Sequence, residues 1–207
     1  MSNNIEFFFD LSSPWTCIAF NNIQPLAKKL DTTIIWRPFL VGGVHNNVNE
    51  AYVESRANNM ASPKWQQLGQ SLLDWASLSN IPMNFPSAHH PLRSVHAMRF
   101  CCALEDNQTE LFRFAEAAFD TYYTDQANLG DPAILIEIAS VLDLDAEQLS
   151  AMSQQQVKKD HLCANTDEAI ACGAFGSPSV YVPFGDGERL YFGNDQLPLV
   201  EWAILQG

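Results

Sequence analysis

Long apolar runs alternate with amphipathic stretches along this 207-residue chain. Residues 5–9 are almost wholly apolar, a pattern typical of a strand buried on both faces. Apolar residues then recur at helical spacing from Pro14 to about Leu30, and Pro25 predicts a kink or an early break in that helix. Residues 32–37 are β-branched and aromatic and end at a proline, which predicts a second strand. This β-α-β opening favours parallel pairing of the two strands.

The middle of the chain is mostly helical in pattern. Residues 44–50 are polar and predict a loop, and residues 81–86 form a connector broken by prolines. In one of the helical stretches Asp131 can cap the helix and Pro132 takes the first position. The predicted helical stretches cover residues 64–78, 94–123, 132–142 and 146–171.

Strand patterns return near the end of the chain. Residues 179–182 and 189–192 flank a Gly-Asp-Gly turn at 185–187, which predicts a hairpin. A short helix is expected over residues 196–205.

The order of these elements predicts one sheet that is built from both ends of the chain. Residues 1–43 plus 172–207 would form the sheet-containing domain, and residues 44–171 an inserted helical domain. Apolar residues make up 47% of the chain, which is ample for a packed core.

Charge and cysteine content narrow the classes of function. Eleven basic against 24 acidic residues give a net charge of −13, which disfavours nucleic acid and anionic membranes as partners. An anionic ligand would need local donors. We see no basic leader and no apolar run near the ~20 residues of a membrane span. Five cysteines without a Cys-x-x-Cys pair fit reduced thiols in a cytoplasmic protein, and no metal site has recognisable spacing.

A Ser-Pro turn joins the first strand to the first helix. Ser12 and Ser13 offer hydroxyl groups suited to a helix N-cap, and Pro14 fits the first helical position. A helix N-terminus carries roughly half a positive charge and unpaired N–H groups, so it attracts anions. Taken alone, the turn indicates only a well-capped helix.

Two further segments also have both a purely structural and a functional interpretation. Ser177 and Pro178 precede a strand, where the proline has no N–H to donate and could be cis. Asn194 or Asp195 could cap the last helix.

Taken together and in order, these segments resemble a known plan. FDLSSPWT (9–16), GAFGSP (173–178) and FGND (192–195) are similar to the disulfide-isomerase-like branch of the thioredoxin fold. More narrowly, they resemble the 2-hydroxychromene-2-carboxylate isomerases and the kappa-class glutathione transferases. WRPFLVGG (36–43) and CANTDEA (163–169) extend the resemblance to nearly the whole chain. It implies an α/β, thioredoxin-like fold with a large all-helical insertion.

The resemblance implies a catalytic role for Ser13, which stands where thioredoxins carry a Cys-x-x-Cys motif. Its hydroxyl would hydrogen-bond the sulfur of bound glutathione. A free thiol has a pKa of ~8.5. A helix terminus contributes up to ~2 kcal/mol and a hydrogen bond to a charged group ~1.5–3 kcal/mol, so we take ~2.7 kcal/mol for the two combined. That would lower the thiol pKa by ~2 units and make the thiolate the major form.

The other glutathione contacts are implied by position. Ser177, before a presumed cis Pro178, would pair its backbone with the tripeptide in a short strand addition. Asn194 and Asp195 would bind the γ-glutamyl end, and Asn165 matches an asparagine near the same ligand.

On the substrate side, His45 lies about where the isomerases place a lysine that meets the substrate carboxylate. Asn49 and Lys64 match further polar positions of that pocket. Arg93 stands where asparagine is common in the family and would be a compensating anion binder. These departures leave the substrate less defined than the cofactor.

The leading activity is therefore glutathione-dependent isomerisation of a 2-hydroxychromene-2-carboxylate-type compound in aromatic compound catabolism. The thiolate would add to the conjugated ring, the adduct would open and rotate, and elimination would return glutathione. The alternative is a kappa-like glutathione transferase or peroxidase acting on another electrophile. A non-catalytic glutathione- or peptide-binding relative is a third reading. The expected partners are a small-molecule substrate and, by family resemblance, a second copy of the chain.

Overall fold

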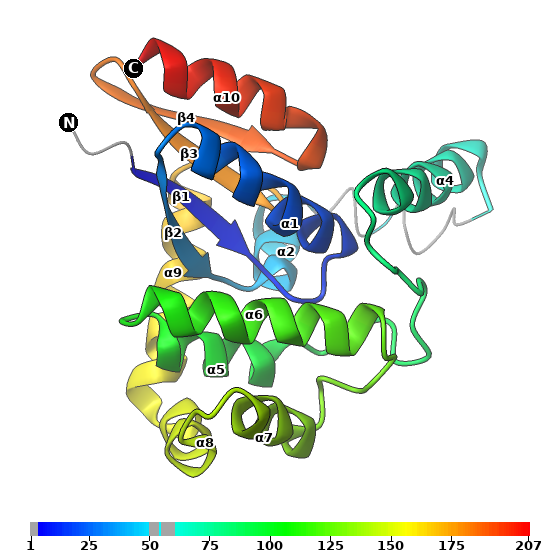
Figure 1. The fold of residues 1–207 in the computed structure, drawn as a ribbon, viewed down its shortest axis with the longest axis vertical. Coiled ribbons are helices and arrows are strands. Elements are labelled where there is room, and N and C mark those ends of the chain that lie inside the picture. Colours follow the sequence, from blue (N-terminus) through cyan, green and yellow to red (C-terminus); the bar gives the residue numbers. More distant parts are fainter. Residues whose placement is uncertain (1–3, 50–53, 55–60) are drawn as a thin grey trace.

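The computed structural model describes residues 4–49, 54 and 61–207, so residue 50 of the predicted loop lies outside it. Within these residues one mixed sheet has the strand order β2-β1-β3-β4 (Figure 1). β1 pairs with β2 in parallel and with β3 antiparallel, and β3 pairs antiparallel with β4. The strands are β1 (Asn4–Phe9), β2 (Thr33–Pro38), β3 (Ser179–Phe184) and β4 (Gly187–Phe192). Both ends of the chain thus build the sheet, as the sequence predicts.

The apolar run of β1 is explained by its central place in the sheet. Phe7 and Phe9 are fully buried on one face, where Phe7 meets Trp36 with ring centroids 5.1 Å apart. Phe8 is buried on the other face, where its ring contacts Phe39 and Tyr181. A strand covered on both sides has no position for a solvated side chain except near its ends.

Helices cover both faces of this sheet. The face that carries Phe7 packs against α1 (Pro14–Lys29), and α10 (Leu197–Gln206) packs on β3 and α1. The face that carries Phe8 is covered by α2 (Val41–Val48) and α9 (Gln156–Ala171). Pro25 lies inside α1 without ending it, so of the two predicted outcomes the early break does not occur, and the kink stays a prediction.

The remaining helices lie between α2 and α9 in the chain. Those described are α4 (Pro63–Leu78), α5 (Val95–Leu104), α6 (Gln108–Tyr123), α7 (Pro132–Val141) and α8 (Ala146–Gln154), as Figure 1 shows.

Three predicted stretches differ from the structure. Most of the predicted polar loop belongs to helix α2. Val44, in the middle of this helix, is fully buried against the sheet, and this burial stabilises the helix. The predicted helix over 94–123 is two helices, because Asn107 caps α6 by accepting a hydrogen bond from the Glu110 N–H. The stretch over 146–171 also divides, because Gln155 has an extended backbone.

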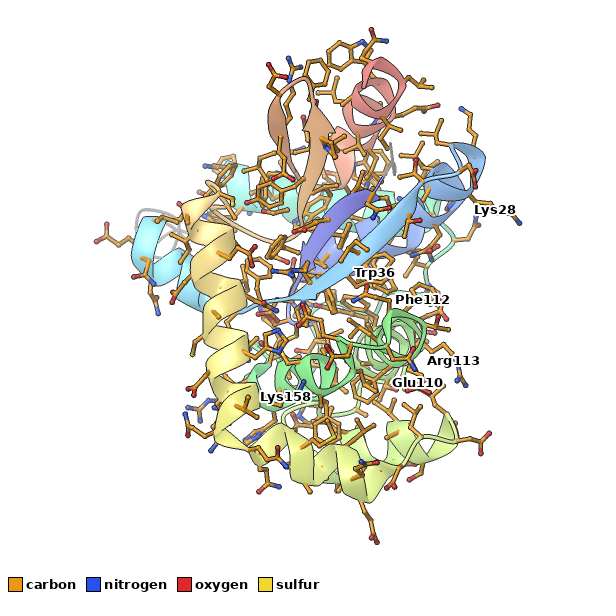
Figure 2. The ribbon with its side chains drawn as sticks, turned by 90° about the vertical axis from the view of Figure 1, so that its left-hand side faces the viewer. Lys28, Trp36, Glu110, Phe112, Arg113 and Lys158 are labelled. Carbon is orange, nitrogen blue, oxygen red and sulfur yellow. The ribbon has the colours of Figure 1, made fainter. Side chains whose placement is uncertain are left out.

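One hydrophobic core joins the sheet to the helical segment. Phe20 of α1 lies 4.4 Å from Trp36 and stacks on Phe112 of α6 at 5.2 Å, measured between ring centroids. Figure 2 shows Trp36 and Phe112 side by side where β2 meets α6. The division into 1–43 plus 172–207 and 44–171 stays a prediction, but the two parts share their packing.

No helix among the described residues is both long enough and apolar enough to cross a membrane.

Candidate active site

Ser13 occupies the turn between β1 and α1 and is the N-cap of that helix, with Pro14 in the first position. Its Oγ accepts a hydrogen bond from the Thr16 N–H at 3.2 Å and donates one to the Ser177 carbonyl at 3.0 Å. The peptide bond between Ser177 and Pro178 is cis, as the resemblance implies. Residues 164 positions apart therefore meet at one hydroxyl group.

The hydroxyl groups of Thr16 and Ser177 hold the same two segments together through further hydrogen bonds. Thr16 Oγ1 and Ser177 Oγ lie 2.7 Å apart, and Ser177 Oγ also accepts from the Asp10 N–H at 3.1 Å. Both side chains are buried. Sequence reasoning missed Thr16, although its place three residues after Ser13 puts both on one face of the helix.

Asp10 is a second residue that sequence reasoning missed. Its carboxylate is buried and accepts hydrogen bonds from the N–H groups of Ser12 and Val41, both at 2.9 Å, and from the Ser94 hydroxyl. Burial raises the pKa of Asp10, and these hydrogen bonds oppose the shift. The group ties the active-site turn to the starts of α2 and α5. An acid that directly follows an apolar strand was the available signal.

The segment with Asn194 and Asp195 is held to the cis-proline loop, because the Gly193 N–H donates to the Pro178 carbonyl at 3.2 Å. Asn194 is buried, and its Oδ1 accepts from Asn22 Nδ2 of α1 at 2.9 Å. Its own Nδ2 is buried without a hydrogen-bond partner among the described residues. Asp195 is exposed. The three sequence elements that carried the resemblance are thus neighbours along α1: the cis-proline loop meets Ser13 at its start, and Asn194 meets Asn22 near its middle.

A pocket of about 450 Å³ opens beside Asp195, between β4 and the segment that precedes the cis proline. Phe175 and Phe192 line it with ring centroids 4.5 Å apart, and both rings are partly exposed. A Cβ on Gly176 would lie 2.5 Å from the Phe192 ring, so a larger residue there would displace this ring. Asn49 reaches the same segment, because its Nδ2 donates to the Phe175 carbonyl at 3.0 Å.

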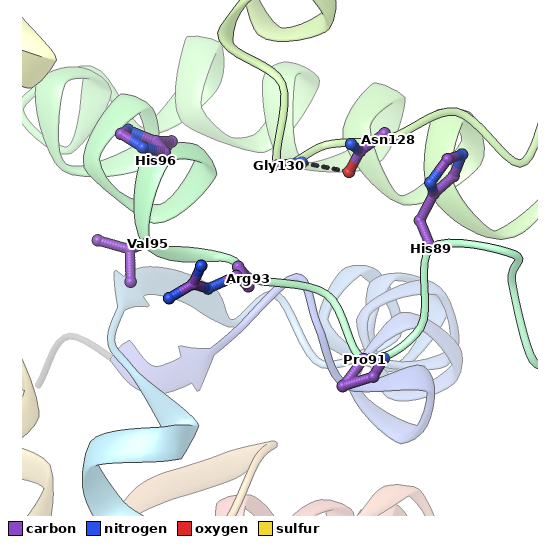
Figure 3. Close-up of a pocket in the computed structure, with 7 residues that line it drawn as sticks. All are labelled: His89, Pro91, Arg93, Val95, His96, Asn128 and Gly130. Atoms are coloured by element: carbon purple, nitrogen blue, oxygen red, sulfur yellow. Dashed lines mark hydrogen bonds between the residues drawn. The ribbon is translucent and has the colours of Figure 1, made fainter.

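The other predicted substrate residues lie on separate elements. His45 is partly buried in the last turn of α2, where its carbonyl accepts from the Asn49 N–H. Lys64 is exposed in the first turn of α4, a helix that packs against α1. Arg93 is exposed just before α5 and lines a second pocket, of about 580 Å³ (Figure 3).

Asn165 is engaged in a buried network within the protein. Its Nδ2 donates to the Pro38 carbonyl at 3.0 Å and to both carboxylate oxygens of Glu105 at 2.9 and 3.1 Å. The pKa of Glu105 is raised to about 7, because the effect of burial outweighs the opposing effect of the Asn165 hydrogen bond. A glutathione contact for Asn165 stays a prediction, whereas its structural partners are defined.

All five cysteines are free thiols. The hydrogen bonds of the Ser13 hydroxyl go to Thr16 and Ser177 and not to a cysteine. Cys17 and Cys101 are buried, and burial raises the pKa of both thiols, which disfavours their thiolate forms. Cys102 lies with Glu105 and His161 in a group whose potential ligand atoms are within 4.8 Å of one another. Lys158 and Arg37 place positive charge against this group, which weakens the case for a cation there.

Comparison with known proteins identifies the family and the fold. The chain matches the family described as DSBA-like thioredoxin domain over residues 4–205. It is 26% identical to glutathione S-transferase kappa 2 of Caenorhabditis elegans, over 95% of this chain and 89% of that protein. It is 24% identical to 2-hydroxychromene-2-carboxylate isomerase of Sphingobium xenophagum, over 99% and 100%. The solved structure of a selenomethionine 2-hydroxychromene-2-carboxylate isomerase superposes with a TM-score of 0.78 at 21% identity, over 97% of this chain and 94% of that one. This chain is a member of the DSBA-like thioredoxin domain family, with a thioredoxin-like fold and an all-helical insertion between its two sheet-forming ends.

Proposed function

We propose that this protein is a glutathione-dependent isomerase of 2-hydroxychromene-2-carboxylate-type substrates in aromatic compound catabolism. The observation that carries the proposal is the Ser13 hydroxyl, which caps α1 and contacts the residue before a cis proline. A relative named 2-hydroxychromene-2-carboxylate isomerase aligns over 99% of the chain and supports the same class of reaction. The expected setting is the cytoplasm, where thiols stay reduced.

The residues around Ser13 fit a bound glutathione, which would supply a nucleophilic thiol. Asn194 has a buried Nδ2 without a partner among the described residues, and a ligand carboxylate would satisfy it. Asp195 offers an exposed carboxylate next to it for an ammonium group. A carboxylate and an ammonium group are the two charged groups that the γ-glutamyl end of glutathione carries.

Ser13 has one hydroxyl proton, which it donates in a hydrogen bond to the Ser177 carbonyl in this structure. The bond from the Thr16 N–H to the same oxygen polarises that proton for donation. If Ser13 donates instead to a sulfur anion, the Ser177 carbonyl becomes an acceptor for an amide N–H of the tripeptide. A single rotation of the hydroxyl would thus favour the thiolate and open the backbone for the ligand.

The chain's own thiols support an isomerisation rather than a disulfide exchange. Serine stands at the active-site position, and burial raises the pKa values of Cys17 and Cys101. Addition and elimination of the glutathione thiolate leave the oxidation state of the substrate unchanged. The protein then needs to activate a sulfur and hold a substrate, but not to exchange electrons.

The second candidate is a kappa-like glutathione transferase or peroxidase acting on another electrophile. It is favoured by the 26% identity to a kappa-class glutathione S-transferase over 95% of this chain. That chemistry needs the same activated thiolate, so Ser13 does not distinguish the two candidates.

The test is an assay of the purified protein with 2-hydroxychromene-2-carboxylate. We expect glutathione-dependent conversion to the benzylidenepyruvate isomer, followed by absorbance, with no turnover when glutathione is omitted. Absence of this conversion, together with conjugation of model electrophiles, would support the transferase. If neither isomerisation nor conjugation occurs while glutathione still binds, the remaining interpretation is a non-catalytic binding protein.

A further inference from the structure

A pocket with basic walls lies on the helical side of the active-site turn. Three of its lining side chains, His89, Arg93 and His96, can donate hydrogen bonds to an anion, and none of its lining residues in the described part of the chain is acidic. Figure 3 shows Arg93 and His96 on one side, Asn128 across from them and His89 at the far end. Its volume of about 580 Å³ suits a small organic molecule.

Two further groups add donors to this pocket. Asn128 Oδ1 accepts from the Gly130 N–H at 3.0 Å, so the amide group that remains for a ligand is its NH₂. Val95 and His96 are the first residues of α5, which has no acidic residue in its first turn and no side-chain cap. The positive end of a ten-residue helix therefore adds to the charge of Arg93.

The surrounding charge makes this concentration of donors significant. The chain carries a net charge of −13, so an anion is repelled by most of the surface. A pocket whose described lining residues include Arg93 and no acid offers an anion local donors. Such a site selects anions over neutral molecules of the same shape.

Direct hydrogen bonds connect the pocket wall to the catalytic turn. Ser94 follows Arg93 in the chain, and its hydroxyl bonds the buried carboxylate of Asp10, three residues before Ser13. The next residue of the turn, Leu11, donates its N–H to Met98 Sδ of α5 at 3.4 Å. The pocket is thereby fixed to the same turn that places the Ser13 hydroxyl.

We propose that this pocket binds an acidic electrophile, with Arg93 as the principal ligand of its carboxylate and His89, His96 and Asn128 as donors to other polar atoms of the same molecule. The inference rests on the proposed function and assigns the specificity for acids to this pocket rather than to His45. It also gives a role to His89, which lines the pocket.

The test compares an acid with its neutral ester at one reactive centre. 4-Chloro-3,5-dinitrobenzoate and its methyl ester both accept the glutathione thiolate at carbon 4, where the new C–S bond replaces the C–Cl bond and chloride leaves with the electron pair. We expect Arg93→Gln to lower the acid-to-ester ratio of kcat/KM by about 10- to 100-fold, the effect of one lost hydrogen bond to a charged group. Lys28→Gln, which removes the same charge at the exposed end of α1, should keep the ratio of the unchanged protein.

Binding supplies a readout that is independent of turnover. Calorimetry with 3,5-dinitrobenzoate should show weaker binding to Arg93→Gln than to Lys28→Gln, while the affinity for glutathione alone stays the same. A loss of glutathione affinity in Arg93→Gln would mean that the pocket holds a carboxylate of glutathione itself, and would overturn the inference. So would a drop in the ratio in His45→Gln but not in Arg93→Gln.

The two proposals fail in distinguishable ways. If glutathione binds and the ester is conjugated, but Arg93→Gln leaves the acid-to-ester ratio unchanged, the pocket inference is wrong and the proposed function stands. If glutathione neither binds nor supports turnover, the proposed function is wrong, whereas Arg93-dependent binding of 3,5-dinitrobenzoate would still support the anion site.

Discussion

At the scale of single residues, the Ser13 hydroxyl has two roles that depend on the same oxygen. As an N-cap it accepts from the Thr16 N–H, and as a donor it holds the Ser177 carbonyl. Removing it costs helix α1 a cap, worth about 1 kcal/mol, and leaves the cis-proline loop without that contact.

Ser13→Ala should therefore raise the pKa of enzyme-bound glutathione by about 1 to 2 units, because one hydrogen bond to the anionic sulfur is lost. Titration of the thiolate absorbance near the ultraviolet edge measures this shift. Ser12→Ala removes a hydroxyl from the neighbouring residue and serves as the matched control. An unchanged titration in Ser13→Ala, in a variant that still binds glutathione, would remove the serine from the mechanism.

At the scale of elements, Glu105 and Asn165 fasten α5 and α9 to the end of β2. Asn165 joins the Pro38 carbonyl to the Glu105 carboxylate, and His161 Nε2 lies 3.2 Å from the same carboxylate. Arg37 of β2 lies 3.7 Å from it and also pairs with Glu168 of α9. The carboxylate is nevertheless buried enough for its pKa to rise to about 7.

This shift makes the stability of the fold dependent on pH. The pKa of Glu105 is about 7 in the folded protein against a reference of 4.5, so the folded form holds the proton more tightly. Its contribution to the free energy of unfolding is complete below pH 4.5 and is lost as pH rises through about 7, an effect of about 3 kcal/mol.

Glu105→Gln, which cannot ionise, should flatten that part of the pH dependence. Urea unfolding at several pH values between 4 and 8 measures it, and Glu110→Gln, on the first turn of α6, controls for the loss of an acid. Identical slopes for Glu105→Gln and the unchanged protein would contradict the assignment.

At the scale of the whole molecule, the sheet and the helical segment share one core. Phe20, Trp36 and Phe112 come from α1, β2 and α6, and their rings are in mutual contact. Elements that share buried aromatic rings cannot lose their packing one at a time without exposing apolar surface. The helical insertion is therefore part of the same packed unit as the thioredoxin-like sheet.

Unfolding should accordingly show a single transition, with tryptophan fluorescence and far-ultraviolet circular dichroism changing at the same denaturant concentration. Phe20→Ala should lower the free energy of unfolding by about 3–5 kcal/mol and shift both signals together, because the ring is 3% exposed. Leu205→Ala, at an exposed position of α10, should change it by less than about 0.5 kcal/mol. Two separate transitions would instead support the domain division at residues 43 and 171.

Local signals in the sequence predicted most elements, and the errors have different physical causes. The cap and proline at Ser13 and Pro14 fixed the start of α1, because capping depends on neighbouring residues alone. The helix around Val44 was missed, because its stability comes from burial against Phe39 rather than from helix propensity. Asn107 acts as a cap within a stretch whose apolar spacing continues across it, so periodicity did not show the break.

The sequence alone determined the buried strand at residues 5–9 and the capped turn at Ser13, since these depend on residue type and short spacing. The order of three motifs along the chain implied the thioredoxin-like fold by resemblance to a known family. Only the tertiary structure decided that Thr16 bonds Ser177, that Asn165 bonds Glu105, and that Arg93 lines a basic pocket. These contacts join residues far apart in the chain. Hydrogen bonds and local fields depend on distance in space, which sequence spacing does not specify.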